Sequence, residues 1–211
     1  LEDSIEPILK QGTFSIGFIG LAETLKALTG YHHGENEEAR RLGFEIIDYI
    51  RKYTDKISEE LSLNFSTYAT PAEGLSSKFI DNDKKVFGII EGITDKDYYT
   101  NSFHVPVSYS ISIKDKIDIE AHYHKLCNAG HISYIEVDDY PNEEIIMSIL
   151  DYAYSKTNIS YIGINFHIRY CKECGNQITG ALNKCDGCGS QNIQGISRVT
   201  GYLSLDERFG H

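Results

Sequence analysis

The sequence predicts an α/β fold followed by a small metal-binding module, and three observations support this. Strand-like and helix-like segments alternate along residues 1–168, as is typical of strands linked by helices. Four of the five cysteines fall between positions 171 and 188, in two CxxC pairs. The composition, 41% hydrophobic and 24% charged over 211 residues, excludes a disordered chain.

The first half of the chain is predicted to hold two helical segments and a strand. Residues Thr13–Leu28 begin rich in glycine and continue with a helical pattern. Glu35–Ser62 is the clearest helix, because apolar residues recur there at steps of three and four. Asn64–Ala69 has the composition of a short strand.

The next elements follow from caps and periodicity. Pro71 is expected at the first position of a helix after Thr70, a good N-cap. The later elements are predicted as strands at Val105–Ile113, His131–Val137 and Ile159–Ile168, and as helices at Asp118–Asn128 and Asn142–Lys156.

Charge and hydropathy argue against nucleic-acid binding, a membrane span and a signal peptide. The chain has 20 basic and 31 acidic residues, a net charge of −11, so it lacks the positive charge that drives non-specific nucleic-acid binding. The longest apolar stretch, Phe14–Ala22, is too short to cross a membrane. The acidic start at Leu1–Asp3 does not fit a signal peptide, so we expect a cytoplasmic protein. Because the sequence begins with Leu1 and not with methionine, we expect it to be processed or to be a piece of a longer chain.

The strongest chemical signal is the pair of CxxC turns, Cys171–Cys174 and Cys185–Cys188, each followed by glycine and separated by ten residues. Two thiolates two residues apart can hold one metal ion from a tight turn, and glycine permits the positive φ of that turn. Four thiolates favour structural Zn²⁺, or iron in a rubredoxin-like site. A redox dithiol or four unrelated cysteines are the alternatives.

Other conspicuous residues receive structural interpretations. Cys127 lies in a predicted helix and is expected to be a small core residue. His32 and His33 follow a glycine in a loop and are expected to be solvated. The spacing of Gly12–Gly17 is similar to the start of a phosphate-binding loop, but Phe18 stands where lysine is required, so we interpret these glycines as packing positions.

Four stretches together carry a family resemblance. They are Arg198–Leu203 (Arg-Val-Thr-Gly-Tyr-Leu), soon after the second CxxC turn, and the upstream stretches Gly12–Glu23, Tyr68–Leu75 and Tyr99–Pro106. In this order the chain resembles the C-terminal region of the anaerobic (class III) ribonucleoside-triphosphate reductases, which are glycyl radical enzymes. The resemblance spans nearly the whole chain.

The resemblance implies an oxidoreductase that converts ribonucleoside triphosphates to deoxyribonucleotides for DNA replication, with ATP binding. Gly201 would carry the stored radical, and the type of residue suits the chemistry because an α-carbon radical is stabilised when planar, where a side chain would clash. A separate iron–sulfur activating enzyme that uses S-adenosylmethionine would install that radical. The zinc module, with Cys171, Cys174, Cys185 and Cys188 as ligands, would have a structural role.

The resemblance also implies the architecture. Residues 1–168 would form the C-terminal part of the catalytic α/β barrel, residues 169–192 a four-cysteine zinc ribbon, and residues 193–211 the glycyl radical loop. The thiyl cysteine of the family would belong to an upstream part that this sequence lacks. The fragment is therefore expected to be inactive alone, and to act with the remainder of the reductase chain, as a homodimer when full length.

Three further residues have two open interpretations. Glu73 is either a capping-box partner or an active-site carboxylate, because it lies in a family-like stretch. Asn101 and His104 are either satisfied hydrogen-bonding residues or part of a nucleotide pocket. For the chain as a whole, the rival functions are a zinc-ribbon protein-interaction module, another glycyl radical enzyme, or a radical-bearing spare part that repairs a cleaved partner.

Overall fold

The computed structural model describes residues 5–137, 141–166, 168–179, 182–199 and 202–205. The chain divides into two compact units. The first comprises residues 1–133 with 153–161, and the second comprises residues 134–152 with 162–211. Among the described residues, no helix combines the length and the apolar character that a membrane span requires.

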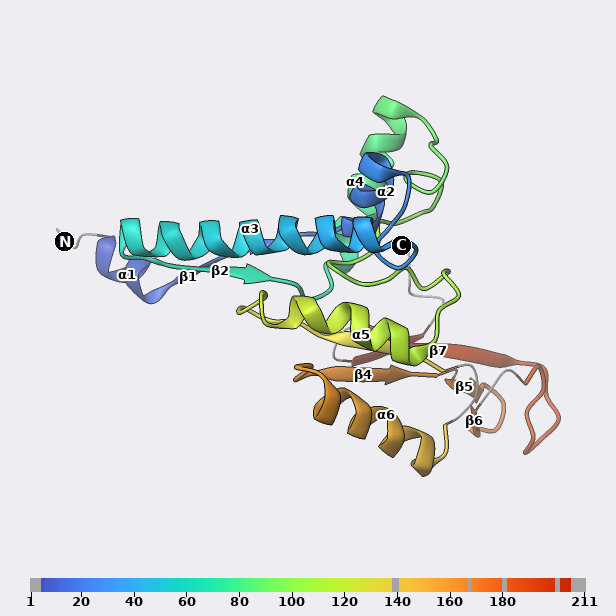
Figure 1. Ribbon diagram of the computed structural model, residues 1–211. Coiled ribbons are helices and arrows are strands. Elements are labelled where there is room, and N and C mark those ends of the chain that lie inside the picture. Colours follow the sequence, from blue (N-terminus) through green and yellow to red (C-terminus); the bar gives the residue numbers. More distant parts are fainter. Residues whose placement is uncertain (1–4, 138–140, 167, 180–181, 200–201, 206–211) are drawn as a thin grey trace. The chain divides into compact units, whose positions relative to one another are not determined.

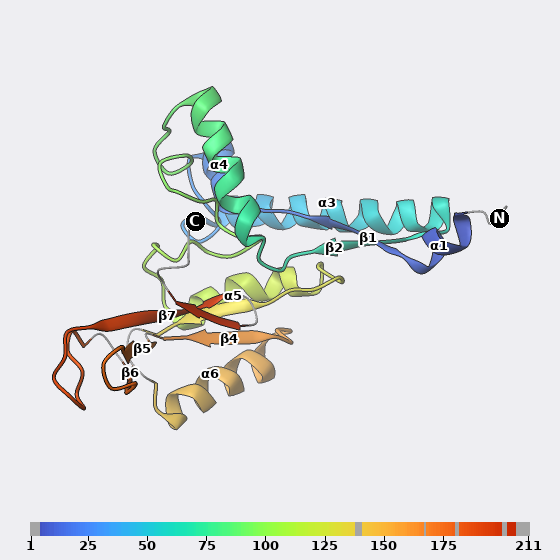
Figure 2. The same cartoon turned by 180° about the vertical axis from the view of Figure 1, so that it is seen from behind.

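The first unit combines helices with a pair of parallel strands. The helices are α1 (Glu6–Gln11), α2 (Leu21–Thr29), α3 (Glu37–Leu61), α4 (Glu73–Phe87) and α5 (Ile113–His124). Strand β1 (Thr13–Gly17) pairs in parallel with β2 (Asn64–Tyr68), so that Thr13 lies opposite Asn64 and Gly17 opposite Tyr68. Helix α3 runs along this pair, as Figures 1 and 2 show from opposite sides.

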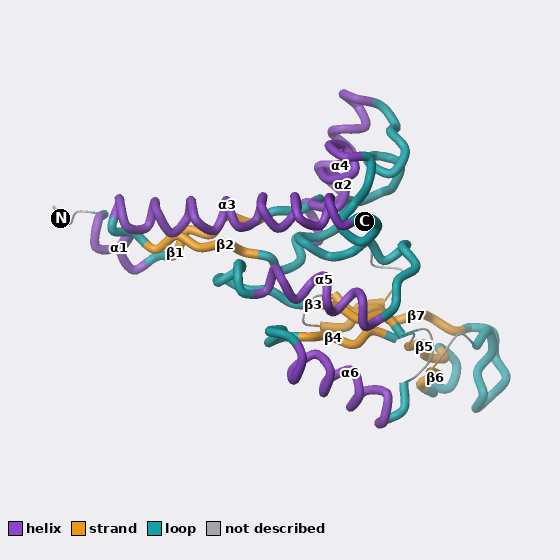
Figure 3. Tube along the Cα trace, viewed as in Figure 1, coloured by secondary structure: helices purple, strands orange, loops and turns teal. Residues whose placement is uncertain are grey.

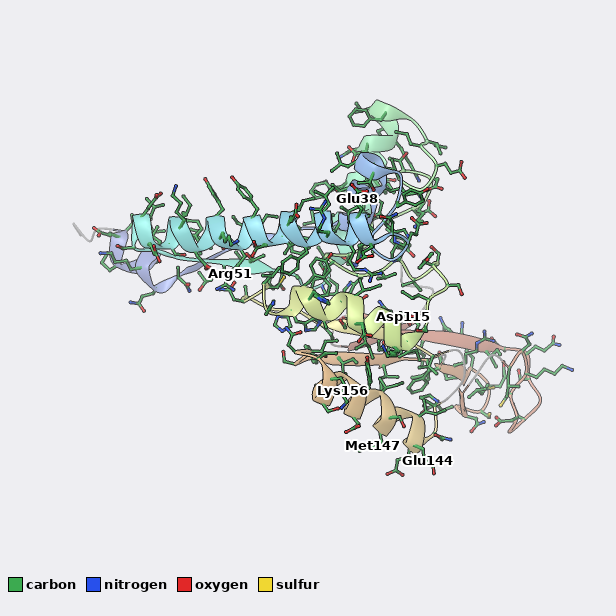
Figure 4. The ribbon with its side chains drawn as sticks, in the orientation of Figure 1. Glu38, Arg51, Asp115, Glu144, Met147 and Lys156 are labelled. Atoms are coloured by element: carbon green, nitrogen blue, oxygen red, sulfur yellow. The ribbon has the colours of Figure 1, made fainter. Side chains whose placement is uncertain are left out.

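Local signals explain why α3 forms where it was predicted. The Asn36 side chain caps the first turn by accepting hydrogen bonds from the backbone N–H groups of Glu38 and Ala39. Ser62 ends the helix with a φ of 51°. Figure 4 shows Glu38 in the first turns and Arg51 further along the same helix. The predicted helix Glu35–Ser62 and the predicted strand Asn64–Ala69 are therefore confirmed.

The core of the first unit lies where α2, α3 and α5 contribute buried side chains. Its members are Leu21, Leu25, Ile47, Ala69, Phe103, Tyr123, Leu126 and Cys127. The rings of Phe103 and Tyr123 stack with centroids 5.3 Å apart. Cys127 is fully buried in this cluster, which confirms it as a small core residue, although it lies just beyond the end of α5. Burial raises the pKa of its thiol to about 12.

The second unit is richer in strands. Strand β3 (Ser133–Glu136) pairs with β4 (Ile162–Asn165), and α6 (Glu143–Lys156) connects them. A four-stranded sheet in the order β6-β5-β7-β8 follows, built from β5 (Ile168–Cys171), β6 (Gln177–Thr179), β7 (Ile193–Val199) and β8 (Tyr202–Leu205). All its pairings are antiparallel, and Figure 3 distinguishes these strands from the loops between them.

Helix α6 confirms the predicted helix Asn142–Lys156. Glu143 and Glu144 occupy its first turn and Lys156 its last, which matches the helix dipole. Figure 4 shows Glu144 and Lys156 at the two ends, with Met147 between them. The predicted strands His131–Val137 and Ile159–Ile168 are also found, in shorter form, as β3 and β4.

One predicted element is wrong, and one predicted helix exists with different bounds. Val105–Ile113 is a loop up to Ser112, because Val105 donates its N–H to the Glu120 carboxylate and not to a neighbouring strand. The helix predicted at Asp118–Asn128 begins at Ile113 and ends at His124, because the Ser112 hydroxyl accepts the N–H of Asp115 and caps the helix earlier.

The start of α4 also differs from its prediction. The helix begins at Glu73, with Ala72 in the N-cap position and no side chain accepting a hydrogen bond there. Thr70 is therefore not the cap, and Glu73 stands at the first helical position, where it cannot be the third-position partner of a capping box. The Thr13–Leu28 prediction missed β1, which precedes α2.

His32 and His33 are buried, contrary to the solvated loop that was expected. The His33 ring lies 2.9 Å from the Phe103 carbonyl oxygen through Nε2, and burial lowers its pKa to about 4. The His32 Nδ1 atom accepts the N–H of Gly34 at 3.0 Å. Hydrogen bonds to backbone groups thus hold both rings in place. The position of these histidines after a glycine did not indicate that they would be buried.

Candidate functional site

The four predicted metal ligands lie together in the second unit. Their sulfur atoms all lie within 4.8 Å of one another, at Cys171, Cys174, Cys185 and Cys188. A tetrahedral ion bound at about 2.3 Å places its sulfur ligands roughly 3.8 Å apart. The Cys171–Cys188 and Cys174–Cys185 Sγ distances are 3.6 and 3.5 Å. The cluster therefore fits one metal ion bound by four thiolates.

The two CxxC turns have matching backbone hydrogen bonds. Gly175 donates its N–H to the Cys171 carbonyl and Gly189 to the Cys185 carbonyl, each at 2.9 Å. Both glycines have a φ of 73°, in the left-handed region that a side chain would disfavour. This matches the prediction that a glycine completes each turn.

Burial and hydrogen bonding within the cluster favour metal ligation. Cys171 and Cys185 are buried with Ile178 and Ile193, whereas Cys174 and Cys188 are exposed. The N–H of Cys188 points to Cys185 Sγ at 3.4 Å, and backbone donors lower the pKa of that thiol to about 6. These donors favour the thiolate of Cys185, the form of cysteine that binds a metal ion, whereas hydrogen bonds among the neighbouring cysteine sulfurs raise the pKa of Cys174 and Cys188.

The predicted radical position, Gly201, lies outside the described residues. The strands on either side are described: Val199 at the end of β7 lies opposite Tyr202 at the start of β8. The assignment of Gly201 stays a prediction.

The three upstream stretches that resemble the family meet in the first unit. Asn101 Oδ1 accepts the N–H of Ala72 at 2.9 Å, and Ser102 donates its hydroxyl to the Ala69 carbonyl at 3.0 Å. Glu23 Oε1 accepts both the N–H and the hydroxyl of Thr100, at 3.2 and 2.7 Å. We define these contacts as the motif junction. Sequence reasoning identified Asn101 but missed Glu23, although Glu23 ends one of the stretches.

The structure describes the surroundings of the His104 side chain but not those of the Glu73 side chain. The His104 ring is buried, its Nε2 atom lies 2.7 Å from the Ile132 carbonyl oxygen, and burial lowers its pKa. This describes a buried core histidine whose ring is held by a backbone carbonyl. Glu73 is the first residue of α4, and the structure describes only its backbone. A nucleotide contact by Glu73, Asn101 or His104 stays a prediction.

A cavity of about 810 Å³ opens beside the motif junction. It lies between α2 and α4, at the carboxyl ends of β1 and β2, where ligands commonly bind in α/β folds. Among its lining residues, Glu23 Oε2 and Thr70 Oγ1 have no hydrogen-bond partner within the described part of the chain. Much of the remaining lining is apolar and includes Phe18, Ile19, Leu28, Leu75, Phe79 and Ile93.

Comparison with protein families decides the relationship. The family model for anaerobic ribonucleoside-triphosphate reductase matches residues 1–211. The chain belongs to this family. The predicted resemblance is therefore confirmed, and with it the place of the chain in the C-terminal portion of such reductases.

Curated anaerobic ribonucleoside-triphosphate reductases are similar over nearly all of this chain. The Escherichia coli reductase is 39% identical over 216 residues, covering 96% of this chain. The reductase of phage T4 is 34% identical, again over 96% of this chain. The chain spans only 30% of the bacterial relative and 33% of the phage relative.

Solved reductase structures share the fold. The Thermotoga maritima anaerobic ribonucleotide reductase in complex with dATP and CTP matches 94% of this chain with a TM-score of 0.73 and 21% identity. The same enzyme with MES in its active site matches with a TM-score of 0.74 and 22% identity. This chain covers about a third of each, 32% and 33%. The predicted α/β arrangement is thus that of a reductase segment.

Proposed function

We propose that this chain is the C-terminal part of an oxygen-sensitive reductase that converts ribonucleoside triphosphates to 2′-deoxyribonucleoside triphosphates. The observation that carries the proposal is the four-thiolate cluster directly upstream of the Arg198–Leu203 signature, in a chain of this family. A free-standing zinc-ribbon module that binds a protein would need the four-cysteine cluster but not the Arg198–Leu203 sequence. The remainder of the reductase chain would supply the thiyl cysteine.

The cluster would hold Zn²⁺ through Cys171, Cys174, Cys185 and Cys188. When bound, the ion would cross-link the two CxxC turns, and a site closed by four thiolates has no open position for chemistry. In this chain, β5 and β7 pair directly beside the turns, and β7 leads to the signature. The module would therefore fix the base of the loop that carries Gly201.

Gly201 would store the radical. The iron–sulfur cluster of the activating enzyme would give one electron to S-adenosylmethionine, which would split into methionine and a 5′-deoxyadenosyl radical. That radical would take one hydrogen atom from the Gly201 α-carbon, giving 5′-deoxyadenosine. The glycyl radical would then take the hydrogen atom of a cysteine thiol in the remainder of the chain. The resulting thiyl would abstract the 3′-hydrogen of the ribose. Only glycine suits the first step, because a planar α-carbon tolerates no side chain there.

The parallel strands β1 and β2 would form part of the catalytic barrel. Parallel sheets occur with both faces covered and with more than two strands, yet all five residues of β1 are exposed and Phe14 is 37% exposed. We propose that strands from the remainder of the reductase cover β1. The cavity between α2 and α4 would then take part of the nucleotide, with Glu23 and Thr70 as its free polar groups.

Air exposure of the activated reductase tests the radical. The full-length protein, activated without oxygen, is expected to show the electron paramagnetic resonance doublet of a glycyl radical. Oxygen should then cut the backbone at Gly201, which mass spectrometry measures. The Gly201→Ala variant should bind metal normally but show neither signal nor cut. A chain that activates yet is cut elsewhere, or that never acquires the signal, would contradict the proposal.

A further inference from the structure

One asparagine connects the two CxxC turns. Asn176 follows Gly175 at the end of the first turn, and its side-chain amide reaches the second. Its Nδ2 donates to Asp186 Oδ1 at 2.6 Å and to Cys185 Sγ at 3.8 Å. An amide NH₂ group has two hydrogens, so both bonds can form at once.

The backbone and the packing of Asn176 hold that amide in place. Its carbonyl oxygen accepts the N–H of Cys171 at 2.9 Å. Gly187 of the second turn packs against the side chain, because a Cβ there would lie 3.3 Å from Nδ2 and 3.4 Å from Cγ of Asn176. Asn176 thus contacts a ligand residue of each turn, and the second turn fits closely over it.

The chemistry of a four-thiolate site gives this contact a role. Four thiolates around a divalent ion leave a net charge of −2, and N–H donors to sulfur spread that charge and orient the ligand. We infer that Asn176 is a positioning residue for the metal, fixing the Cys185 thiolate across the two turns. This inference rests on the proposed metal site.

Metal titration of the 211-residue chain tests the inference. Zinc affinity is measured by competition with a chromophoric chelator, and the Co²⁺-loaded protein gives the sulfur-to-metal charge-transfer band. Asn176→Ala is expected to lower zinc affinity by about 10–100-fold. The band should move to lower energy, because a thiolate without its N–H donor gives up an electron more easily.

Two further variants separate this role from packing. Asn176→Asp keeps the side-chain shape against Gly187 but places an oxygen beside Asp186 in place of the NH₂ donor. It should show the same band shift and a larger loss of affinity, part of which comes from repulsion between the two carboxylates. Asn192→Ala is the matched control. It removes a 2.7 Å hydrogen bond to Glu173 Oε1 near the same turns, but that amide donates to no cysteine sulfur among the described residues. Its affinity and band should stay at wild-type values.

The outcomes are distinct. If the wild-type chain binds no metal through four cysteines, the proposed metal site fails. If it binds metal but Asn176→Ala and Asn176→Asp behave like Asn192→Ala, the positioning role of Asn176 is overturned. A loss confined to Asn176→Ala, without a band shift in Asn176→Asp, overturns it as well and assigns the effect to packing.

Discussion

Lys116 and Glu120 lie one turn apart on α5 and form an ion pair whose two side chains are only 11% and 0% exposed. Glu120 Oε1 also accepts the N–H of Val105 at 3.0 Å. Burial alone would raise the pKa of Glu120, but Lys116 and His104 hold that pKa below its usual value. The carboxylate is therefore charged in the core and depends on its lysine.

Replacing Lys116 by methionine should destabilise the protein strongly. Lys116→Met leaves a buried carboxylate without its partner, which costs about 3–5 kcal/mol in the free energy of unfolding. Lys114→Met is the matched control, since Lys114 pairs with Asp118 at the same spacing on the same helix but is 63% exposed. That variant should lose less than about 1 kcal/mol. Denaturant unfolding measures both, and equal losses would contradict the argument.

The same pair predicts a pH dependence. Because the folded-state pKa of Glu120 is lowered, its stabilising contribution is present above the pKa of the unfolded chain and is lost as pH falls through the folded-state pKa. In Lys116→Met, protonation relieves the unpaired charge. The stability difference between the variant and the wild type should therefore shrink as pH falls. A difference that is constant between neutral and acidic pH would refute this account.

Helices α2, α3 and α5 approach one another at Gly43 of α3. A Cβ at Gly43 would lie 2.8 Å from Tyr123 Oη and 2.9 Å from Leu25 Cδ1, both in the core of the first unit. Gly43→Ala should therefore cost about 1–3 kcal/mol through overpacking. Gly74→Ala, in α4, meets no atom within 4 Å and should be neutral or slightly stabilising. Thermal unfolding of the two variants checks the contrast, which fails if Gly43→Ala is as stable as the wild type.

The elements show which structure a sequence can predict. Helices α3 and α6 were predicted because their apolar periodicity is local, as is the cap of α6, where the Asn142 Oδ1 atom accepts the N–H of Ile145. Strand β1 was missed because its pairing with β2 joins residues far apart in the chain. The strand predicted at Val105–Ile113 was wrong for the same reason. This segment is a loop, because the N–H of Val105 donates to the carboxylate of Glu120.

The candidate site also combines features that the sequence predicts with features that depend on tertiary structure. The four-cysteine cluster was predicted because CxxC spacing fixes its geometry within each turn. The Lys116–Glu120 pair is visible in the sequence only as an i,i+4 pair, which usually lies on the surface. Asn101 was singled out, but its bond to Ala72 depends on tertiary structure that spacing does not reveal.

The molecule as a whole contains two units with very different cores. Among the described residues, the hydrophobic cluster beside the four cysteines comprises Cys171, Ile178 and Cys185, with Ile193 packed against them, whereas the cluster in the first unit has eight buried members. So small a hydrophobic cluster would depend on the proposed metal ion for its stability. Removing the metal with a chelator should therefore open β5–β8 while α3 and α5 stay folded. Hydrogen–deuterium exchange by peptide measures this, and simultaneous loss of protection in both units would contradict it.

The motif junction has a consequence for recombining related reductases. Asn101 holds Ala72, Ser102 holds Ala69, and Glu23 holds Thr100, so each stretch supplies a partner that another requires. A chimaera that replaces one stretch keeps these hydrogen bonds only if the incoming stretch carries matching donors and acceptors at these positions. Exchanging Gly12–Glu23, Tyr68–Leu75 and Tyr99–Pro106 together preserves all of these partners.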